Sequence, residues 1–412
     1  MRTTRENFGL GEKSPQKFGH SQGPLARLTG MVQRNPWAAW SLLSYKFQSD
    51  LGHHLNRRLF PEKSLPPSYI SLNPTRRCNL KCRMCIQHRH TPERPRDLPW
   101  YRPDQELPLE AWIPLLDELT GWRPILFITG GEPLLYPHIL ELIEEAKKRN
   151  LLVHLQTNGL LLEKVADQLV ALGVEMVTVS IDGPPAVHDY IRGPGTFERS
   201  ARGLTALRAA RAHRQSPVPV VDIRCTISQD NVAALGQLPS VALELGVDLL
   251  QFTHTIFLSQ DLVARHNRLL TPAWAESHGL TLIQPSIPAG EYYESGIGPE
   301  TLPIILSGLR EVKEKARGRL KVLFSPALPL DLIAPYYLDL NYPFPQACRA
   351  LWRSCRILPD GTVSPCLHLV MGNITKEPLR EIWNNSCMQN FRKIIATQLL
   401  PGCARCCQRG FT

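Results

Sequence analysis

The chain has 412 residues and 43% of them are hydrophobic, so it can form a sizeable core and more than one domain. No stretch approaches the roughly 18 uninterrupted apolar residues of a membrane-spanning helix, and the opening MRTTRENFGLGEK lacks the apolar core of a secretory signal. The composition argues against wholesale disorder and against a membrane-spanning helix, and we expect the protein in the cytoplasm.

The formal net charge is +10, and residues 1–66 carry ten Lys or Arg against four Asp or Glu. A basic arm of this kind contacts nucleic acid, a membrane surface or an anionic partner, or is simply a solvated leader. It contains a helix candidate, residues 36–51, with apolar side chains on more than one side. We expect this helix to dock on the protein body, and the alternative is a position in a membrane interface.

From residue 68 short β-branched and aliphatic runs alternate with longer amphipathic segments. The strand candidates are residues 68–75, 125–133, 151–159, 176–182, 220–227 and 249–256. The segments between them, such as 161–173, repeat apolar residues with the helical period, and Gly173 provides a helix stop. Strands separated by helices predict parallel pairing with right-handed crossovers, in an open doubly wound sheet or a partial barrel. We expect the site at the C-terminal edge of this sheet.

After residue 260 the alternation is lost, and a stretch rich in Pro, Tyr and Leu carries short helix candidates such as residues 301–318. We expect it to bridge to a small cysteine-rich module and partly to cover the barrel mouth. The expected organisation is therefore a basic leader over 1–66, a barrel over 67–260, a bridging segment over 261–346 and a cysteine-rich module over 347–412.

The cysteines are clustered: three of the eleven lie within residues 78–85 and seven within residues 348–407. In a reducing compartment such clusters indicate metal ligation. Cys78, Cys82 and Cys85 stand in a C-x3-C-x2-C spacing directly after the first strand candidate. Three thiolates on one loop can hold three corners of a four-iron cluster and leave the fourth iron open to a small molecule. The alternative is a zinc site with His88 as fourth ligand, which seldom opens a strand–helix array.

This cysteine loop resembles the signature of the radical S-adenosylmethionine enzymes, and further motifs follow in that family's order up to residue 256. The GGEP sequence from Gly130 resembles the motif that binds the methionine amine, where glycine lets the backbone approach a ligand closely. Arg192 matches a position that often pairs with the methionine carboxylate. Met84 stands where the family usually has an aromatic residue, and its thioether can still pack against a ring. The resemblance implies these cofactor contacts: Gly130, Gly131, Glu132, Pro133, Thr157, Asn158, Ser180, Asp182 and Arg192.

The resemblance implies an α/β fold, a partial (β/α)6 barrel with a small C-terminal α+β module rich in cysteine. It also implies that S-adenosylmethionine binds the open iron of the cluster. An electron from a donor such as flavodoxin or ferredoxin would then break the C5′–S bond, and the 5′-deoxyadenosyl radical would remove hydrogen from a substrate. No residue of this sequence is singled out as the catalytic one.

The second cysteine group begins at Cys348, and the Asp-Gly pair at residues 360–361 predicts a hairpin within it. The group resembles the auxiliary-cluster module called SPASM or Twitch. The resemblance implies one auxiliary iron–sulfur cluster with the ligands Cys348, Cys366, Cys403 and Cys406. Cys355, Cys387 and Cys407 are then surplus, with Cys355 as a replacement ligand or a close neighbour. The alternative is a zinc ribbon.

Several further residues are candidates for a function. We expect structural roles for four of them: Cys225 as a buried strand residue, His154 as a core or barrel-lining group, and Trp352 and Trp383 as packing of the module. His254, at the end of the last strand candidate, either faces the substrate or has a structural place. His368 either hydrogen-bonds near the second cluster or has no role.

The sequence favours a bulky or apolar small molecule, a lipid or a cofactor precursor as substrate, because the bridge is apolar and rich in Pro and Tyr and no N-terminal winged-helix peptide-binding domain is evident. The alternative is a modifier of a ribosomal peptide or of a protein side chain. A zinc-binding adaptor and an iron–sulfur electron carrier are more distant alternatives, since an adaptor leaves the GGEP motif unexplained and a carrier needs no barrel. Neither cysteine group has the aromatic and basic interleaving of a nucleic-acid surface, so we do not expect nucleic acid to bind at either group.

Overall fold

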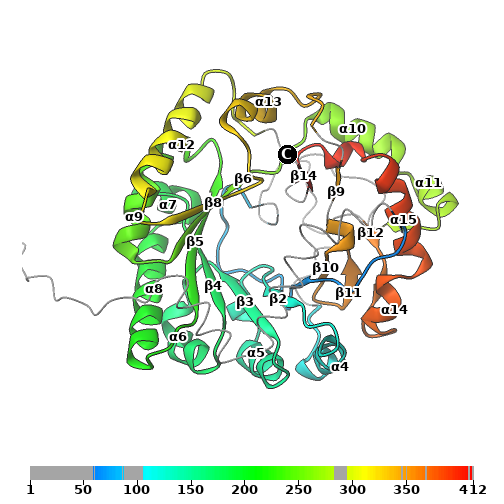
Figure 1. The fold of residues 1–412 in the computed structure, drawn as a ribbon, viewed down its shortest axis with the longest axis horizontal. Coiled ribbons are helices and arrows are strands. Elements are labelled where there is room, and N and C mark those ends of the chain that lie inside the picture. The colour runs from blue at the N-terminus through cyan, green and yellow to red at the C-terminus, as the bar shows by residue number, and fades with distance from the viewer. Residues whose placement is uncertain are drawn as a thin grey trace, which may run out of the picture.

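The computed structural model describes residues 59, 61–85, 87, 105–282, 295–344, 347–348, 350–366, 369–406 and 409–410. The helix candidate at residues 36–51, most of the basic leader, His88, His368 and Cys407 lie outside these ranges. A strongly curved sheet organises the molecule, with a row of helices along its outer side (Figure 1). None of the described helices is both long and apolar enough to cross a bilayer.

The sheet has ten strands in the order β13-β11-β10-β1-β2-β3-β4-β5-β6-β8. Its centre is formed by β1 (Tyr69–Leu72), β2 (Ile125–Ile128), β3 (Leu152–Thr157), β4 (Met176–Ser180), β5 (Val220–Ile227) and β6 (Leu249–His254). These six strands pair in parallel and in chain order. The predicted parallel pairing is confirmed, and the chain is an α/β protein with a partial (β/α)6 barrel.

Helices follow the central strands on the outer side. They are α4 (Leu109–Leu119), α5 (Ile139–Lys148), α6 (Leu162–Ala171), α7 (Pro185–Arg192), α8 (Thr196–His213) and α9 (Leu238–Leu245). The burial of α6 illustrates why they form, since Leu162, Ala166 and Leu169 recur with the helical period and are buried. The chain leaves this helix at Gly173, whose φ of 73° suits glycine.

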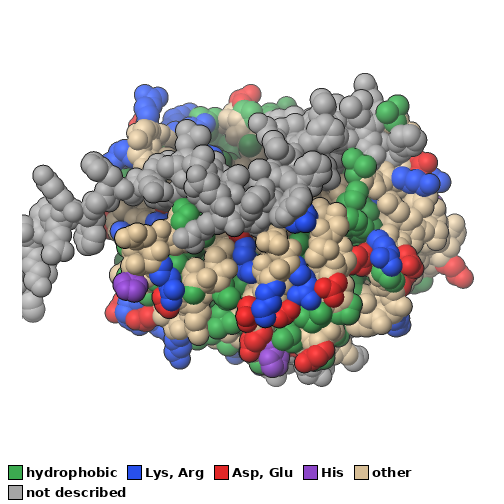
Figure 2. Space-filling model, turned by 60° about the horizontal axis from the view of Figure 1, so that its bottom comes forward, with side chains coloured by type: hydrophobic (Ala, Val, Ile, Leu, Met, Phe, Trp, Pro, Cys, Tyr) green, Lys and Arg blue, Asp and Glu red, His purple; other side chains and the backbone are tan. Residues whose placement is uncertain are grey.

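The outer surface of these helices carries both signs of charge in close alternation (Figure 2). On α5, Lys148 lies 3.2 Å from Glu144 and 2.8 Å from Glu145, and on α8 Arg202 lies 2.8 Å from Glu198. Pairs as exposed as these contribute little to stability. This outer face is a solvated surface of mixed charge, and we expect the reactive site on the inner side of the curved sheet.

The two faces of the sheet differ. Residues that face the helices, such as Ile70, Leu72, Leu126 and Ile128, are fully buried. Each such side chain contributes ~1.5–3 kcal/mol to folding relative to full exposure. The opposite, inner face carries a row of polar side chains: His154, Gln156, Thr178, Asp222, Arg224 and Gln251. We call this face the inner wall of the barrel.

The C-terminal module is joined to the main sheet. Its strand β10 (Ser354–Ile357) pairs in parallel with β1, and β11 (Thr362–Ser364) and β13 (Gly372–Asn373) continue the sheet in antiparallel fashion. The predicted hairpin is present between β10 and β11, with Gly361 at a φ of 83°. The helices α14 (Leu379–Trp383) and α15 (Ser386–Thr397) pack beside it. Trp352 and Trp383 are buried there, as predicted.

The bridging segment contains more regular structure than the sequence indicates. It includes α10 (Gln260–Leu269), α11 (Pro272–Ser277), β7 (Thr281–Leu282), α12 (Leu302–Ala316), β8 (Lys321–Ser325) and α13 (Ile333–Leu338). The strand β8 pairs in parallel with β6, so a further strand extends the barrel sheet. The short strand β7 pairs with β12 (Leu369–Val370) of the module, and β9 (Ala347–Cys348) pairs with β14 (Arg409–Gly410).

Candidate functional site

The first cysteine loop follows β1 at the C-terminal edge of the sheet. Cys82 is buried, Cys78 and Cys85 are partly buried, and all three pack with Leu80 and Leu160. Burial raises the pKa of the Cys78 thiol to about 11, and the neighbouring Cys82 and Cys85 add to that rise. Thiols so close together ionise readily only when a cation binds them, as a metal site requires.

The GGEP glycines hold this loop in place. The Gly131 N–H donates to the Thr75 carbonyl at 3.0 Å, and the Glu132 N–H donates to the Arg77 carbonyl at 2.8 Å. A Cβ on Gly130 would lie 2.4 Å from the Thr75 oxygen, and one on Gly131 would lie 2.2 Å from the Arg77 oxygen. The glycines were expected to make room for a ligand, whereas the close approach seen here is to the backbone of the cysteine loop.

An ion pair that the sequence did not reveal secures the same loop from outside. The Arg77 guanidinium binds both oxygens of Glu106, at 2.7 and 2.8 Å, and the Thr75 hydroxyl donates to the same carboxylate. A bidentate pair of this kind fixes orientation as well as distance. The backbone just before Cys78 is therefore held in a fixed orientation.

Glu132 is a fully buried carboxyl that joins two strand ends. It accepts hydrogen bonds from the Thr157 hydroxyl at 2.7 Å, the Asn158 N–H at 2.7 Å and the Leu134 N–H at 3.1 Å. Burial raises its pKa, and these donors oppose that rise. Asn158 in turn donates to Asn79 of the cysteine loop at 2.7 Å. The end of β2, the end of β3 and the cysteine loop thus form one hydrogen-bonded unit.

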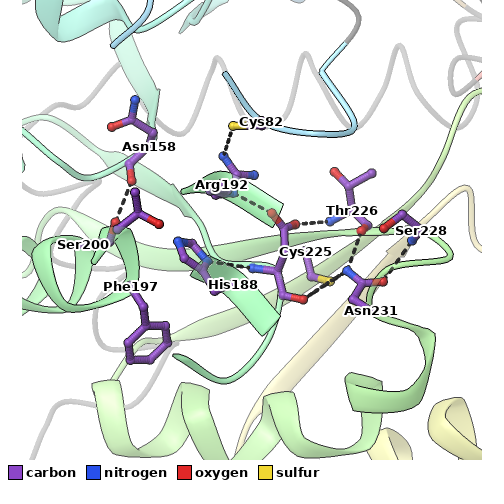
Figure 3. Close-up of polar contacts among 12 residues, drawn as sticks. Cys82, Asn158, His188, Arg192, Phe197, Ser200, Cys225, Thr226, Ser228 and Asn231 are labelled. Atoms are coloured by element: carbon purple, nitrogen blue, oxygen red, sulfur yellow. Dashed lines mark hydrogen bonds and ion pairs between the residues drawn. The ribbon is translucent and has the colours of Figure 1, made fainter. Parts of the chain in front are cut away.

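A second unit joins β4 and α7 to the cysteine loop (Figure 3). Arg192 Nε lies 2.5 Å from the Asp182 carboxylate, and its Nη1 lies 3.8 Å from the Cys82 sulfur. Burial works to lower the pKa of Arg192, but Asp182 and the Cys82 thiol outweigh it and the net change is upward. The Asp182 carboxylate also accepts the Thr226 N–H at 2.9 Å. A buried cation therefore faces the thiols that a cluster would use.

Asn231 supports this unit from below, and no motif in the sequence pointed to it. Its amide donates to the Asp182 carbonyl at 3.0 Å, to the Thr226 carbonyl at 2.8 Å and towards the Cys225 sulfur at 3.4 Å (Figure 3). Cys225 is fully buried in β5, as expected of a structural residue.

The remaining residues of the expected cofactor set lie at the same edge. Pro133 begins a short 3-10 turn (Pro133–Leu135), and Ser180 ends β4 opposite Arg224 of β5. The fold thus gathers the whole set near the cysteine loop, at the ends of β2, β3 and β4 and at the end of α7.

The second cysteine group converges as well. Cys403 is partly buried, and its pKa is raised first by desolvation and then by Cys366, Cys406 and Cys348. These thiols come from β9, from the end of β11 and from a short 3-10 turn (Pro401–Cys403) with its continuation. The Cys406 N–H donates to the Cys403 carbonyl at 3.3 Å. The structure brings together the four cysteines that the sequence grouped.

Two of the surplus cysteines, Cys355 and Cys387, are not among the thiols that act on Cys403. Cys355 faces the core from β10 beside Arg392, and burial raises the pKa of its thiol to about 12. Its thiol is not among the neighbours of Cys403, so the expectation of Cys355 as a replacement ligand gains no support. Cys387 lies on α15, with its sulfur 3.6 Å from the Val370 carbonyl oxygen.

The spacing of the thiols bears on the kind of metal site. None of the described cysteines forms a disulfide. In the described ranges, no three His, Cys, Asp or Glu side chains are grouped closely enough to hold a single metal ion. Four zinc ligands would have to meet ~2.3 Å from one ion. The thiolates of a four-iron cluster each bind a different iron and stand further apart. The two kinds of site thus require different spacings of the same thiols.

Two family models match the chain, one before and one after the bridging segment. The model of the radical SAM superfamily matches residues 72–225. The model of the iron–sulfur cluster-binding domain SPASM matches residues 348–407. The chain is a radical SAM enzyme with a SPASM module. Its cofactors are accordingly a four-iron, four-sulfur cluster, S-adenosylmethionine and auxiliary iron–sulfur.

Curated relatives match this radical SAM enzyme over most of its length. An AdoMet-dependent heme synthase of Methanosarcina barkeri is 28% identical, covering 83% of this chain and 88% of its own. A PqqA peptide cyclase of Ruegeria pomeroyi is 26% identical, covering 85% of this chain and 82% of its own. The crystal structure of Streptococcus suis SuiB bound to S-adenosylmethionine has a TM-score of 0.54 at 14% identity, covering 87% of this chain and 75% of that chain. That likeness shows a shared fold.

The SPASM module of this enzyme is tied to the bridging segment by Arg405, which sequence analysis overlooked. Arg405 is fully buried and donates to the carbonyls of Tyr336 at 2.5 Å, Asp339 at 2.6 Å and Pro335 at 3.2 Å. Because Arg405 stands between Cys403 and Cys406, the second cysteine group and α13 are positioned together.

His254 does not belong to the inner wall. It ends β6 on the same side as the buried Phe252, and its Nδ1 lies 2.7 Å from the Tyr337 hydroxyl of α13. Tyr336 stacks obliquely against it, with ring centroids 5.4 Å apart. Burial lowers the pKa of His254 to about 4. This residue is a structural link to α13 rather than a group facing the barrel interior.

His154 does belong to the inner wall, as one of the two expected alternatives. Its Nε2 lies 2.7 Å from the Thr178 hydroxyl, which donates in turn to the Asp222 carboxyl. Burial lowers the pKa of His154 to about 3, and Arg224 contributes to that shift. The imidazole is therefore neutral at physiological pH.

Proposed function

We propose that this enzyme cleaves S-adenosylmethionine reductively at a cluster held by Cys78, Cys82 and Cys85, and removes a hydrogen atom from a small cofactor precursor inside the barrel. When bound, the cluster and S-adenosylmethionine supply the 5′-deoxyadenosyl radical. The protein binds and orients both reactants and excludes water. The observation that carries the proposal is the position of the cysteine loop at the open edge of a polar inner wall.

The residues around the loop have defined tasks in this proposal. Glu132, through Thr157 and Asn158, sets the shape of the edge that receives the methionine and ribose of the cofactor. Backbone groups of Gly130, Gly131 and Pro133 line that edge, together with Ser180 of β4. Asp182 holds Arg192 beside Cys82, where the guanidinium offsets negative charge of the thiolates and reaches the methionine carboxylate.

We assign Cys348, Cys366, Cys403 and Cys406 to a single auxiliary cluster. Four protein ligands leave no open iron for a substrate, so such a cluster would supply a one-electron acceptor. The net reaction is then an oxidation of the substrate. An external donor such as flavodoxin or ferredoxin would reduce the first cluster. The clustered thiols also suit a reducing compartment, and we infer the cytoplasm.

A cofactor precursor of the tetrapyrrole class is the first substrate to test. It is favoured by the similarity to an AdoMet-dependent heme synthase over 88% of that relative's length. On the inner wall, the Arg224 Cζ lies 5.9 Å from the centroid of the Phe127 ring. An aromatic surface beside a cation suits a substrate that is largely apolar and carries an acid group. The competing candidate is a peptide modifier, which the similarity to a PqqA peptide cyclase favours.

The experiment compares these classes on the anaerobically reconstituted, reduced enzyme. Iron coproporphyrin III and a set of synthetic ribosomal precursor peptides are each incubated with S-adenosylmethionine, and 5′-deoxyadenosine and product masses are followed by mass spectrometry. We expect the tetrapyrrole to raise 5′-deoxyadenosine formation and to lose mass. Stimulation and mass change in a peptide alone would replace this proposal with the peptide-modifying one.

A further inference from the structure

Arg224 is a cation on the inner wall whose hydrogen-bond partners among the described residues are neutral. It lies in the middle of β5, and its Nη1 and Nη2 donate to the amide oxygens of Gln156 at 2.9 Å and Gln251 at 2.8 Å. Its Nε is buried and has no hydrogen-bond partner within the described part of the chain. Two neutral amides thus fix the guanidinium, and no carboxylate of the described residues forms an ion pair with it.

The neighbouring carboxyl of Asp222 is engaged elsewhere. Asp222 stands two residues earlier on the same face of β5, where it takes the hydrogen bond of Thr178 and leaves its second oxygen without a partner. No ion pair joins Asp222 to Arg224 among the residues that the structure describes, although the two interact electrostatically. A half-buried guanidinium that forms no ion pair with a described carboxylate has donors left for an anionic ligand, and such a ligand would lower the free-energy cost of its burial.

The surroundings of Arg224 indicate what else such a ligand contains. The guanidinium lies over the ring of Phe127, which also contacts Tyr69 at 5.4 Å and His154 at 4.8 Å between centroids. An aromatic wall with one cation fits a mainly apolar molecule that carries a carboxylate, because planar guanidinium groups bind carboxylates with two parallel hydrogen bonds.

Arg224 also lies close to the source of the radical. It pairs in register with Ser180 of β4, and it precedes Thr226 by two residues, or about 7 Å along the strand. Thr226 binds Asp182, which holds Arg192 beside Cys82. A carboxylate anchored at Arg224 would place the adjoining carbon atoms between the inner wall and the cysteine loop.

We propose that Arg224 binds a carboxylate of the substrate, with Gln156 and Gln251 as residues that position its guanidinium. This assignment rests on the proposed function and specifies the substrate as an acid. The methionine carboxylate of S-adenosylmethionine is the competing ligand for Arg224, and the test separates it from a carboxylate of the substrate.

The test measures binding of iron coproporphyrin III and of its tetramethyl ester by absorption change, with wild type and with Arg224→Gln, Arg224→Lys and Arg202→Gln. The last variant removes an exposed arginine from the outer surface of α8 and is the control. We expect Arg224→Gln to weaken binding of the acid roughly 10- to 100-fold and to leave binding of the ester unchanged. Arg224→Lys keeps the charge and should lose less affinity. Iron content and circular dichroism establish that each variant is folded.

Other outcomes overturn the assignment in distinguishable ways. Equal binding of the acid by wild type and Arg224→Gln would contradict the role of Arg224 and leave the proposed function standing. Weaker binding of S-adenosylmethionine, with unchanged binding of coproporphyrin, would show that Arg224 serves the cofactor. If neither porphyrin binds wild type nor stimulates 5′-deoxyadenosine formation, the proposed substrate class fails and the anchor with it.

Discussion

Single buried polar residues join the segments at the C-terminal edge of the sheet, and Glu132 is the clearest of them. Its carboxyl accepts three hydrogen bonds, from Thr157, Asn158 and Leu134, without any contact with solvent. The residues that it joins come from the end of β3 and from the turn after β2. Replacing one oxygen of this side chain should therefore disturb the contacts between these segments.

We predict that Glu132→Gln destabilises the fold by about 1–3 kcal/mol and weakens S-adenosylmethionine binding, because the amide nitrogen replaces one of the accepting oxygens. Thermal unfolding and equilibrium dialysis of S-adenosylmethionine measure the two effects. The matched control is Glu141→Gln on the exposed side of α5, which should change neither. If Glu132→Gln matches wild type in both measurements, the joining role of this carboxyl is wrong.

Asp222 gives the inner wall a pH dependence. Burial raises its pKa from 3.8 to about 6, while Arg224 and the Thr178 hydrogen bond oppose the rise. Between these two pH values the folded protein holds a proton that the unfolded chain releases, so stability is lost as the pH rises through this window. At pH 8 the buried Asp222 carboxyl is ionised.

We expect Asp222→Asn to gain about 1 kcal/mol of stability relative to wild type when the pH is raised from 5.5 to 8. The midpoints of thermal unfolding of both proteins at the two pH values measure this change. A difference between variant and wild type that is the same at both pH values would show that Asp222 does not titrate in this range.

At the scale of elements, the contact between the end of β2 and the cysteine loop is the critical one. The two segments approach so closely that only glycine fits, since a Cβ on Gly131 would lie 2.2 Å from the Arg77 carbonyl oxygen. Backbone cannot yield as a flexible side chain can, so a methyl group there must displace the loop that carries the three cysteines.

We predict that Gly131→Ala lowers the iron content to that of the second site alone and costs about 1–3 kcal/mol of stability. Gly121→Ala is the control, because its Cβ would find its nearest atom at an ordinary 3.7 Å. Iron and sulfide analysis after anaerobic reconstitution measures the outcome. Full iron content in Gly131→Ala would mean that the loop position does not depend on this contact.

At the scale of the whole molecule, local signals in the sequence predicted the central barrel. Each of its strands is a short apolar run followed by an amphipathic helix, and both periods are visible within a few residues. The cysteine loop and the GGEP motif were equally local. The four cysteines of the module could be grouped because their spacing, together with the resemblance to a known module, compensates for their distance along the chain.

What the sequence did not predict depends on contacts between distant segments. The pairing of β10 with β1 joins the two ends of the described chain, and no pattern in Ser354–Ile357 specifies that partner. The strand β8 alternates exposed and half-buried residues, so it lacks the apolar character of the other barrel strands. The pair of Arg77 and Glu106 and the contacts of Arg405 likewise join groups far apart in sequence.

The central claim is that radical chemistry starts at the first cysteine loop and that the second group holds a separate cluster. The most direct measurement is 5′-deoxyadenosine formation, with iron counted in the same samples, for anaerobically reconstituted wild type, Cys82→Ala and the control Cys387→Ala. We predict about eight irons and 5′-deoxyadenosine in wild type and in the control. Cys82→Ala should keep about four irons and form none. If Cys82→Ala still forms 5′-deoxyadenosine, the assignment of the first loop is contradicted.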